Sequence, residues 1–397
     1  MAEQRYARIV SRATLTCFLA FCLLGMAGTF LRENETVSYY ENRTLAAMPT
    51  FTGAGVLDGT SFSALEAFLQ DHAAGRRTIL KLVTWLELYV LRRPVVNGVV
   101  VQEDILLPYL AYEAVDEAAI GTAAEAEARN LADHAAQTES YGGAFYYVAV
   151  PCQYVCCADR YPWYLNNREA YTQAASEALF RRLDELGVHY IDMLEEFRAA
   201  GSPAAFSSAV DNHYGISGAY QTYLALMRAV TEETAWNLEV LEPDAVTVTE
   251  LENPYLGSRV RKLLGLRDGS ERLSILTPQQ PVPFTRQDNG SPVSPTVYLL
   301  PQTPQEPVQY SLYMGGDIAS TVIDTERPWL PSILIYGDSF TNALECVAWW
   351  SFDKLVSLDF RYYSEMTLEE ILAAYQPEIV VCVRDYEAML SVSGNGA

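Results

Sequence analysis

The sequence predicts an α/β fold, in which helices cover both faces of a parallel sheet, preceded by one transmembrane helix. Three observations support this prediction. Short apolar segments alternate with helical patterns along most of the chain, which is typical of strands joined by crossover helices. The apolar segments are nearly continuous rather than alternating, as in sheets buried on both faces. A long uncharged segment lies near the N-terminus.

The N-terminal uncharged segment runs from Ala13 to Leu31. As a helix it would span about 28 Å, close to the thickness of the hydrocarbon core of a bilayer. The basic residues before it are Arg5, Arg8 and Arg12, and the acidic residues after it are Glu33 and Glu35. This charge asymmetry places the N-terminus in the cytoplasm and the remaining chain outside. We interpret 13–31 as an uncleaved anchor after a cytoplasmic segment, 1–12, with a cleaved signal peptide as the alternative.

The elements that follow the anchor are predicted from apolar spacing. After a linker over 32–60, apolar residues at helical spacing predict a helix over 61–93. Residues 243–330 are richer in Pro, Thr, Gln and Gly, which predicts an irregular β-rich insertion. The other predicted elements are helices over 114–140, 167–187 and 219–231, and strands over 95–101, 144–150, 189–191, 332–336, 354–358 and 378–383. A short tail, 391–397, ends the chain.

Composition excludes several classes of protein. Half of the 397 residues are apolar and 19% are charged, so the chain is not largely disordered. The net charge of −23 argues against binding to nucleic acid, which depends on Lys and Arg contacts to phosphates, and against anionic lipid head groups. The Cys152, Cys156 and Cys157 cluster has no second cluster and no nearby histidine, which argues against zinc. We find no metal, phosphate or nucleotide motif and expect no cofactor.

A serine follows the apolar run Ile333–Tyr336, in the sequence Gly337-Asp338-Ser339. A sharp turn between a buried strand and a helix exposes the serine hydroxyl. The helix start also offers unpaired N–H groups and a partial positive charge, which suit an oxyanion. Ser339 is therefore a candidate nucleophile. The alternative is that Ser339 or Asp338 only caps the following helix.

An aspartate and a histidine are placed two residues apart in Asp211-Asn212-His213. Such a pair supplies a general base, His213, and a carboxylate that orients its ring, Asp211. In the alternative interpretation His213 is a satisfied loop histidine and Asp211 caps the loop. The other histidines have no such partner at a helix entry: we expect His72 to be structural, His134 to be solvated on a helix face and His189 to be a packing residue.

The order of these motifs resembles the DHHW family, relatives of the alginate O-acetylation proteins AlgJ and AlgX. The resemblance covers about 35–385. The motifs, in chain order, are Glu41-Asn42-Arg43 with Leu45 and Pro49, Asp71 with Arg76, Asn97-Gly98-Val99, Asp211-Asn212-His213-Tyr214 with Gly218-Ala219-Tyr220, Gly337-Asp338-Ser339-Phe340 and Asp359-Phe360-Arg361-Tyr362-Tyr363. The motif that names the family reads Asp-Asn-His-Tyr here, so asparagine takes the place of its first histidine.

The resemblance implies an SGNH-hydrolase-like catalytic domain over 61–390, outside the plasma membrane and held by the single-pass anchor. It assigns the nucleophile to Ser339, the base to His213 and the orienting acid to Asp211, with the Ser339 backbone N–H in the oxyanion hole. The implied reaction transfers an acetyl group through acetyl-serine to a polysaccharide. A membrane-bound O-acyltransferase is the implied acetyl source.

Two other functions remain open on the sequence, a carbohydrate O-acetylesterase and a catalytically silent polysaccharide-binding or assembly protein. The same three residues serve a transferase and an esterase. For substrate contacts we name Tyr214 and Arg361, with an internal ion pair as the alternative for Arg361. For Arg43 we expect an internal ion pair.

Overall fold

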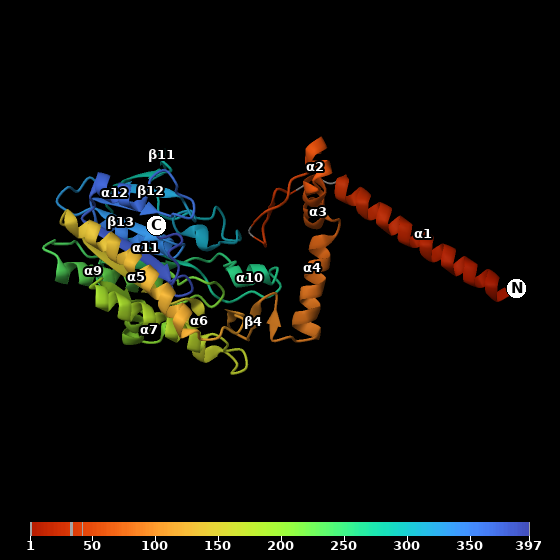
Figure 1. The fold of residues 1–397 in the computed structure, drawn as a ribbon, viewed down its shortest axis with the longest axis horizontal. Coiled ribbons are helices and arrows are strands. Elements are labelled where there is room, and N and C mark those ends of the chain that lie inside the picture. The colour runs from red at the N-terminus through yellow and green to blue at the C-terminus, as the bar shows by residue number, and fades with distance from the viewer. Residues whose placement is uncertain (1, 32–34, 42, 397) are drawn as a thin grey trace. The chain divides into compact units, whose positions relative to one another are not determined.

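The computed structural model describes residues 2–31, 35–41 and 43–396. The chain forms two compact units, one of Met1–Asn97 with Arg261–Arg267, and one of Gly98–Val260 with Asp268–Ala397 (Figure 1). The helical region predicted over 61–93 belongs to the first unit, and the predicted domain boundaries otherwise stay predictions. Glu33 and Asn42, which entered the charge and motif arguments, lie outside the described residues.

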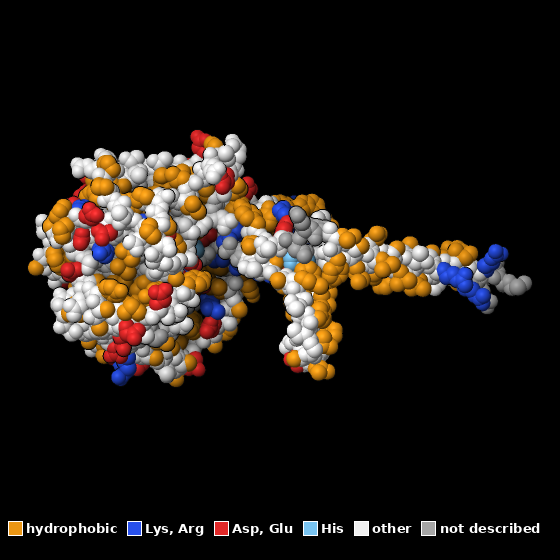
Figure 2. Space-filling model, turned by 90° about the horizontal axis from the view of Figure 1, so that it is seen from above, with side chains coloured by type: hydrophobic (Ala, Val, Ile, Leu, Met, Phe, Trp, Pro, Cys, Tyr) orange, Lys and Arg blue, Asp and Glu red, His pale blue; other side chains and the backbone are white. Residues whose placement is uncertain are grey.

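The first unit begins with one long apolar helix, α1 (Ala2–Phe30). Within it, Arg5–Phe30 is long and apolar enough to cross a membrane. Figure 2 shows hydrophobic side chains along α1 and basic side chains gathered at its N-terminal end. The remaining elements of this unit are β1 (Val37–Ser38), β2 (Arg43–Thr44), α2 (Gly53–Leu57), α3 (Thr60–His72), α4 (Arg76–Trp85), a π-helical turn (Leu86–Val90) and β3 (Val95–Val96).

The single helix predicted over 61–93 is wrong, because the helix is broken between α3 and α4. Gly75 stands at the break with φ of 79°, a left-handed conformation that glycine adopts without strain. The ion pairs predicted for Arg43 are confirmed: its guanidinium contacts the carboxylates of Asp71 and Glu41. His72 has the structural role predicted for it, because its Nε2 lies 2.9 Å from the carbonyl oxygen of Ala46.

The second unit is built on an eight-stranded sheet with the order β11-β10-β12-β14-β13-β15-β6-β7. The five strands from β14 to β7 in that order are parallel, as predicted: β6 (Ala144–Val150), β7 (Tyr190–Asp192), β13 (Ile333–Gly337), β14 (Lys354–Leu358) and β15 (Ile379–Asp385). Side chains of β13 and β15 are almost entirely buried, which explains their continuous apolar sequences.

The predicted β-rich insertion is part of the sheet rather than an appendage. It contributes the antiparallel edge strands β10 (Thr285–Asp288), β11 (Ser291–Val293) and β12 (Ser320–Asp324). Two further antiparallel pairs are β8 (Val246–Glu250) with β9 (Ser274–Pro278), and β4 (Val99–Val101) with β5 (Leu106–Pro108).

Helices form two layers on the sheet (Figure 1). One layer holds α5 (Glu117–Ser140), α7 (Glu169–Leu186) and α12 (Leu368–Tyr375), and the other α8 (Met193–Ala200), α9 (Ile216–Glu233) and α11 (Thr341–Ala348). The short helices are α6 (Gln153–Cys156) and α10 (Ser258–Lys262), with 3₁₀ turns at Ala158–Arg160, Pro203–Ala205, Pro243–Ala245, Tyr310–Leu312 and Trp349–Ser351. The α/β class predicted from the alternation of elements is confirmed.

Two polar residues of α5 face the core. The prediction that His134 is solvated is wrong: it is 3% exposed, and its Nδ1 lies 3.0 Å from the Tyr336 hydroxyl. Burial lowers the pKa of His134 to about 4. Glu127 is fully buried and accepts a hydrogen bond from Asn395, while its second carboxylate oxygen has no partner among the described residues. The α5 face that carries both residues packs against the sheet and is not the solvated one.

The buried Glu127 carboxyl makes the stability of the fold depend on pH. Burial raises its pKa to about 8, although Arg384 and Asn395 partly oppose the shift. In the unfolded chain the carboxyl ionises near its ordinary pKa of about 4. Stability is therefore lost as pH rises between these two values, because the unfolded state releases the proton first.

We expect Glu127→Gln to raise the melting temperature by several degrees at about pH 8 and to leave it nearly unchanged at about pH 4. Thermal melts of the full chain in detergent across this range measure the effect. Glu139→Gln, at an exposed position of the same helix, is the matched control. An unaltered pH dependence in Glu127→Gln would show that this carboxyl ionises normally.

Candidate active site

The turn after β13 is specified by its glycine and its aspartate. A Cβ atom on Gly337 would lie 2.0 Å from the carbonyl oxygen of Val383, so only glycine allows β15 to approach so closely. The Asp338 carboxylate accepts the backbone N–H of Phe340 at 3.0 Å and that of Asp385 at 3.2 Å. Asp338 therefore holds the turn, and the Ser339 side chain does not cap α11.

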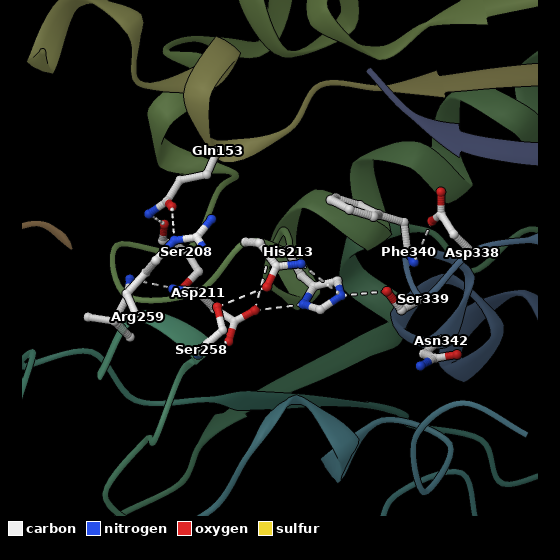
Figure 3. A network of polar contacts seen from close by, with 12 residues as sticks. Gln153, Ser208, Asp211, His213, Ser258, Arg259, Asp338, Ser339, Phe340 and Asn342 are labelled. Carbon is white, nitrogen blue, oxygen red and sulfur yellow. Dashed lines mark hydrogen bonds and ion pairs between the residues drawn. The ribbon is translucent and has the colours of Figure 1, made fainter. Parts of the chain in front are cut away.

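The structure brings Ser339, His213 and Asp211 into one chain of hydrogen bonds (Figure 3). Ser339 Oγ lies 2.7 Å from Nε2 of His213, and Nδ1 of His213 lies 2.6 Å from Oδ1 of Asp211. Ser339 is half-buried, while the Asp211 side chain is 2% exposed. With Nδ1 protonated, Nε2 is free to accept the serine proton, which is the arrangement that activates a hydroxyl as a nucleophile.

The Asp211 carboxylate is held by more than the histidine ring. Its Oδ1 also accepts the His213 backbone N–H at 3.2 Å, and its Oδ2 accepts the N–H of Ser258. Burial alone would raise the pKa of Asp211, but the hydrogen bond and the attraction from His213, with the Ser258 N–H, hold it well below its usual range. Asp211 is therefore ionised at neutral pH and can stabilise a protonated His213.

A second layer of contacts shapes the loop that carries Asp211. Ser208 Oγ accepts the N–H of Val210 at 3.1 Å and that of Asp211 at 2.9 Å, and donates to Glu271 at 2.8 Å. The amide of Gln153 donates to the carbonyl oxygen of Ser208 at 2.9 Å. These buried contacts fix the loop before the substrate arrives, as a preorganised site requires.

Two aromatic rings contact the imidazole of His213. The Tyr310 ring stacks on His213 with centroids 3.8 Å apart and planes 4° apart, and the Phe340 ring contacts it with centroids at 5.1 Å. Tyr310 is 7% exposed. Sequence reasoning missed Tyr310, because it comes from the predicted insertion, where no periodicity marks single residues.

Two donors near Ser339 point to an oxyanion site. Among the described residues, the Ser339 backbone N–H donates to no acceptor. Asn342 lies on the first turn of α11, and Figure 3 shows its side chain beside Ser339. Its Nδ2 donates one hydrogen to Asp317 at 3.0 Å. For its second amide hydrogen there is no acceptor among the residues that the structure describes. The Ser-x-x-Asn spacing, one helical turn, is the signal by which the sequence could have indicated Asn342.

The asparagine within the Asp-Asn-His motif also contacts the imidazole. Asn212 Nδ2 lies 3.3 Å from His213 Nε2, and Asn212 Oδ1 accepts the Ser258 hydroxyl at 2.9 Å. Ser258 can approach this loop because a Cβ on the preceding Gly257 would lie 2.3 Å from the carbonyl oxygen of Val210. Ser258 thus holds both Asp211 and Asn212.

The two residues named for substrate contacts have other partners. Tyr214 is 1% exposed and its hydroxyl donates to the carbonyl oxygen of Phe340 at 2.7 Å, so its side chain packs inside the fold. It supports the Ser339 turn instead. Arg361 makes the internal ion pairs of the alternative interpretation, with Asp359 at 2.6 Å and Asp317 at 3.2 Å. The two carboxylates offset its charge.

Comparisons with known proteins place the fold. No protein-family model and no curated protein matches the sequence. Bacillus cereus PatB1, solved with a sulfonyl adduct, aligns with 73% of this chain and 95% of its own, at 18% identity and a TM-score of 0.62. A DHHW family protein from Eubacterium siraeum aligns with 76% of this chain and 95% of its own, at 16% identity and a TM-score of 0.58.

The O-acetyltransferase domain of Pseudomonas putida AlgJ aligns with 74% of this chain and 92% of its own, at 13% identity. Its TM-score of 0.45 is too low to carry an argument about this chain. The structural neighbours thus include the DHHW family that the order of motifs predicts. PatB1 and the DHHW family protein show that the chain shares its α/β fold with solved structures.

Proposed function

We propose that the chain is a membrane-anchored O-acetyltransferase that acts on a polysaccharide through Ser339, His213 and Asp211. The observation that carries the proposal is the hydrogen-bonded chain of these three residues. An activated serine is the kind of group that sulfonyl reagents modify, and the PatB1 structure contains a sulfonyl adduct. The sequence resemblance to alginate O-acetylation proteins supports acetyl as the group and a sugar as the acceptor.

The first half of the proposed reaction forms an acetyl-serine. His213 Nε2 takes the proton of Ser339 Oγ as this oxygen attacks the acetyl carbonyl carbon of the donor. The Ser339 N–H and the Asn342 amide stabilise the negative oxygen of the tetrahedral intermediate. When the bond to the donor oxygen breaks, His213 returns its proton to the leaving alcohol. Asp211 stabilises the imidazolium between these two steps.

The second half transfers the acetyl group to its acceptor. A sugar hydroxyl gives its proton to His213 Nε2 and attacks the acetyl-serine carbonyl carbon. The same two donors hold the oxyanion, and breaking the bond to Ser339 Oγ restores the serine with the proton from His213. Water in place of the sugar makes the enzyme an esterase.

The identity of the acceptor is tested by following the acetyl group. Full-length chain in detergent is incubated with p-nitrophenyl acetate and a panel of oligosaccharides, and acetylated sugar and free acetate are quantified by mass spectrometry. We expect acetylated sugar to form at the expense of free acetate. Free acetate alone with every acceptor would make the protein an esterase, and no nitrophenol release would support the silent binding protein.

The proposal makes Asn342 the second oxyanion donor. We expect Asn342→Ala to lower kcat by about 10²–10³-fold with little change in KM, because the oxyanion forms only during reaction. Asn253→Ala removes another buried amide that is bonded to two carbonyl oxygens, and controls for lost stability. Steady-state kinetics with an activated acetyl ester measures both variants. Equal losses in the two would make Asn342 structural only.

The site of action and the acetyl source are also proposals. The apolar helix α1 supports anchoring to the plasma membrane with the second unit outside the cytoplasm. A membrane-bound O-acyltransferase is the proposed source of acetyl groups, because such a protein and the anchored chain would lie at the same membrane surface.

A further inference from the structure

The polar side of helix α4 faces the other residues of the first unit. Thr84 is buried, and its Oγ1 accepts a hydrogen bond from the Asn97 amide at 3.1 Å. Lys81, one turn earlier, donates to the Tyr40 hydroxyl at 3.3 Å and lies over the Tyr40 ring, 4.7 Å from its centroid. This is the reverse of a helix in a water-soluble domain, which buries its apolar face.

An apolar stripe covers the outer side of α4 and of the π-helical turn that continues it. The stripe consists of Ile79, Leu82, Val83, Leu86 and Val90, which are 59%, 63%, 48%, 42% and 55% exposed. Their spacing repeats every three or four residues, so they share one helix face. Trp85 and Tyr89, both 44% exposed, lie beside the stripe with ring centroids 6.1 Å apart. Aromatic rings of this kind are enriched where membranes meet water.

The charge of this segment is opposite to that of the chain. Between residues 76 and 93 there are five basic residues and one acidic residue, in a protein with a net charge of −23. Arg76 at the start of the helix pairs with Glu41, and Arg93 after its end pairs with Glu87. Arg77 and Arg92, one at each end, are exposed. The acidic net charge of the whole chain therefore does not exclude contact between this basic segment and anionic lipids. A basic helix with one apolar face is typical of helices that lie in a membrane surface.

The end of α1 contacts α3 and the short link between α3 and α4. The backbone N–H of Ala74 donates to Thr29 Oγ1 at 3.0 Å, and the Phe30 ring stacks with Phe68 at 6.2 Å between centroids. Ala74 is two residues before α4 begins. Because Thr29 and Phe30 end the apolar span, a bilayer around α1 would have its outer surface at the start of α4.

We propose that α4, with the turn Leu86–Val90, lies in the outer interface of the bilayer. Its apolar stripe enters the acyl chains, while Arg77 and Arg92 at its two ends stay among anionic head groups. The proposal rests on α1 spanning the membrane. The occupant of the stripe is lipid rather than a protein, because the basic ends, the aromatic pair and the contact of the link before α4 with the end of α1 all fit a bilayer surface.

The test uses full-length chain in nanodiscs of phosphatidylcholine and phosphatidylglycerol, with acyl chains either brominated or not. Bromine quenches tryptophan fluorescence only over short distances, so it reports rings that enter the lipid. We expect quenching in wild type and its loss in Trp85→Phe. Trp163→Phe, an 89% exposed ring of the second unit, should leave the quenching unchanged.

A second pair of variants tests the stripe itself while keeping Trp85. Leu82→Glu should reduce the quenching, and Leu299→Glu, equally exposed at 63% but in the second unit, should not. Co-elution with nanodiscs reports insertion of α1 separately. Chain that co-elutes without quenching would overturn the proposal and leave the stripe for a protein partner. Chain that does not co-elute would overturn both the anchor and the proposal, whereas the Ser339 chemistry is assayed independently of either.

Discussion

Replacing Ser339 with alanine is expected to abolish turnover of activated acetyl esters, with a loss in kcat on the order of 10⁶-fold, and to leave the melting temperature nearly unchanged. The substitution removes one oxygen whose described partner is Nε2 of His213. Ser339 is half-buried at the start of a helix it does not cap, so no closed cavity forms and no cap is lost. The hydrogen bonds of Asp338 that hold the turn remain.

The measurement for Ser339→Ala is release of p-nitrophenol by full-length chain in detergent, with thermal melts on the same samples. Ser364→Ala, at an exposed turn after β14, is the matched control and should keep full activity. Turnover at the wild-type rate in Ser339→Ala would assign the nucleophile to another residue.

Replacing Asp211 with asparagine is expected to lower kcat by about 10³–10⁴-fold while the fold persists. The Ser258 N–H needs an acceptor, so the carbonyl oxygen of the new amide faces Ser258 and its NH₂ group faces His213. Nδ1 of His213 must then accept, which moves the ring proton to Nε2. In a neutral imidazole the nitrogen that carries the hydrogen is a donor only, so Nε2 could no longer accept the proton of Ser339.

Kinetics of Asp211→Asn beside Asp288→Asn separates this effect from a general loss of charge. Asp288 pairs with Arg286 within strand β10 and is remote in sequence from the three site residues. We expect Asp288→Asn to retain kcat within a few fold. If Asp211→Asn also retained kcat within a few fold, the Asp211 carboxylate would not set the tautomer of His213.

The sequence was most informative about the residues at the carboxyl end of β13 and about the loop that carries Asp211 and His213. Gly337-Asp338-Ser339 follows a continuous apolar strand, and such strands lie inside a parallel sheet with their carboxyl ends at one edge. The spacing of Asp211 and His213 in a loop predicted their mutual contact, which the structure shows at 2.6 Å. Their meeting with Ser339, 126 residues from His213, could only be inferred from the chemistry.

The residues that sequence reasoning missed depend on tertiary packing. Tyr310 stacks on His213 from a region without periodicity, and the strands of that region join the sheet at an antiparallel edge. The spacing of apolar residues predicted the helical character of α4 but not which face it exposes. Helical periodicity carries no information on whether water, protein or lipid covers the apolar side, so the outward stripe had to come from the structure.

Trapping the acetyl-enzyme tests the central claim most directly. Full-length chain is mixed with p-nitrophenyl acetate, quenched in acid after a short time and analysed by intact-protein and peptide mass spectrometry beside Ser339→Ala. We predict one added acetyl group, located on Ser339 in wild type and missing from the variant. No adduct in wild type together with no ester turnover, or an adduct on another residue that persists in Ser339→Ala, would contradict the assignment of Ser339 as the nucleophile.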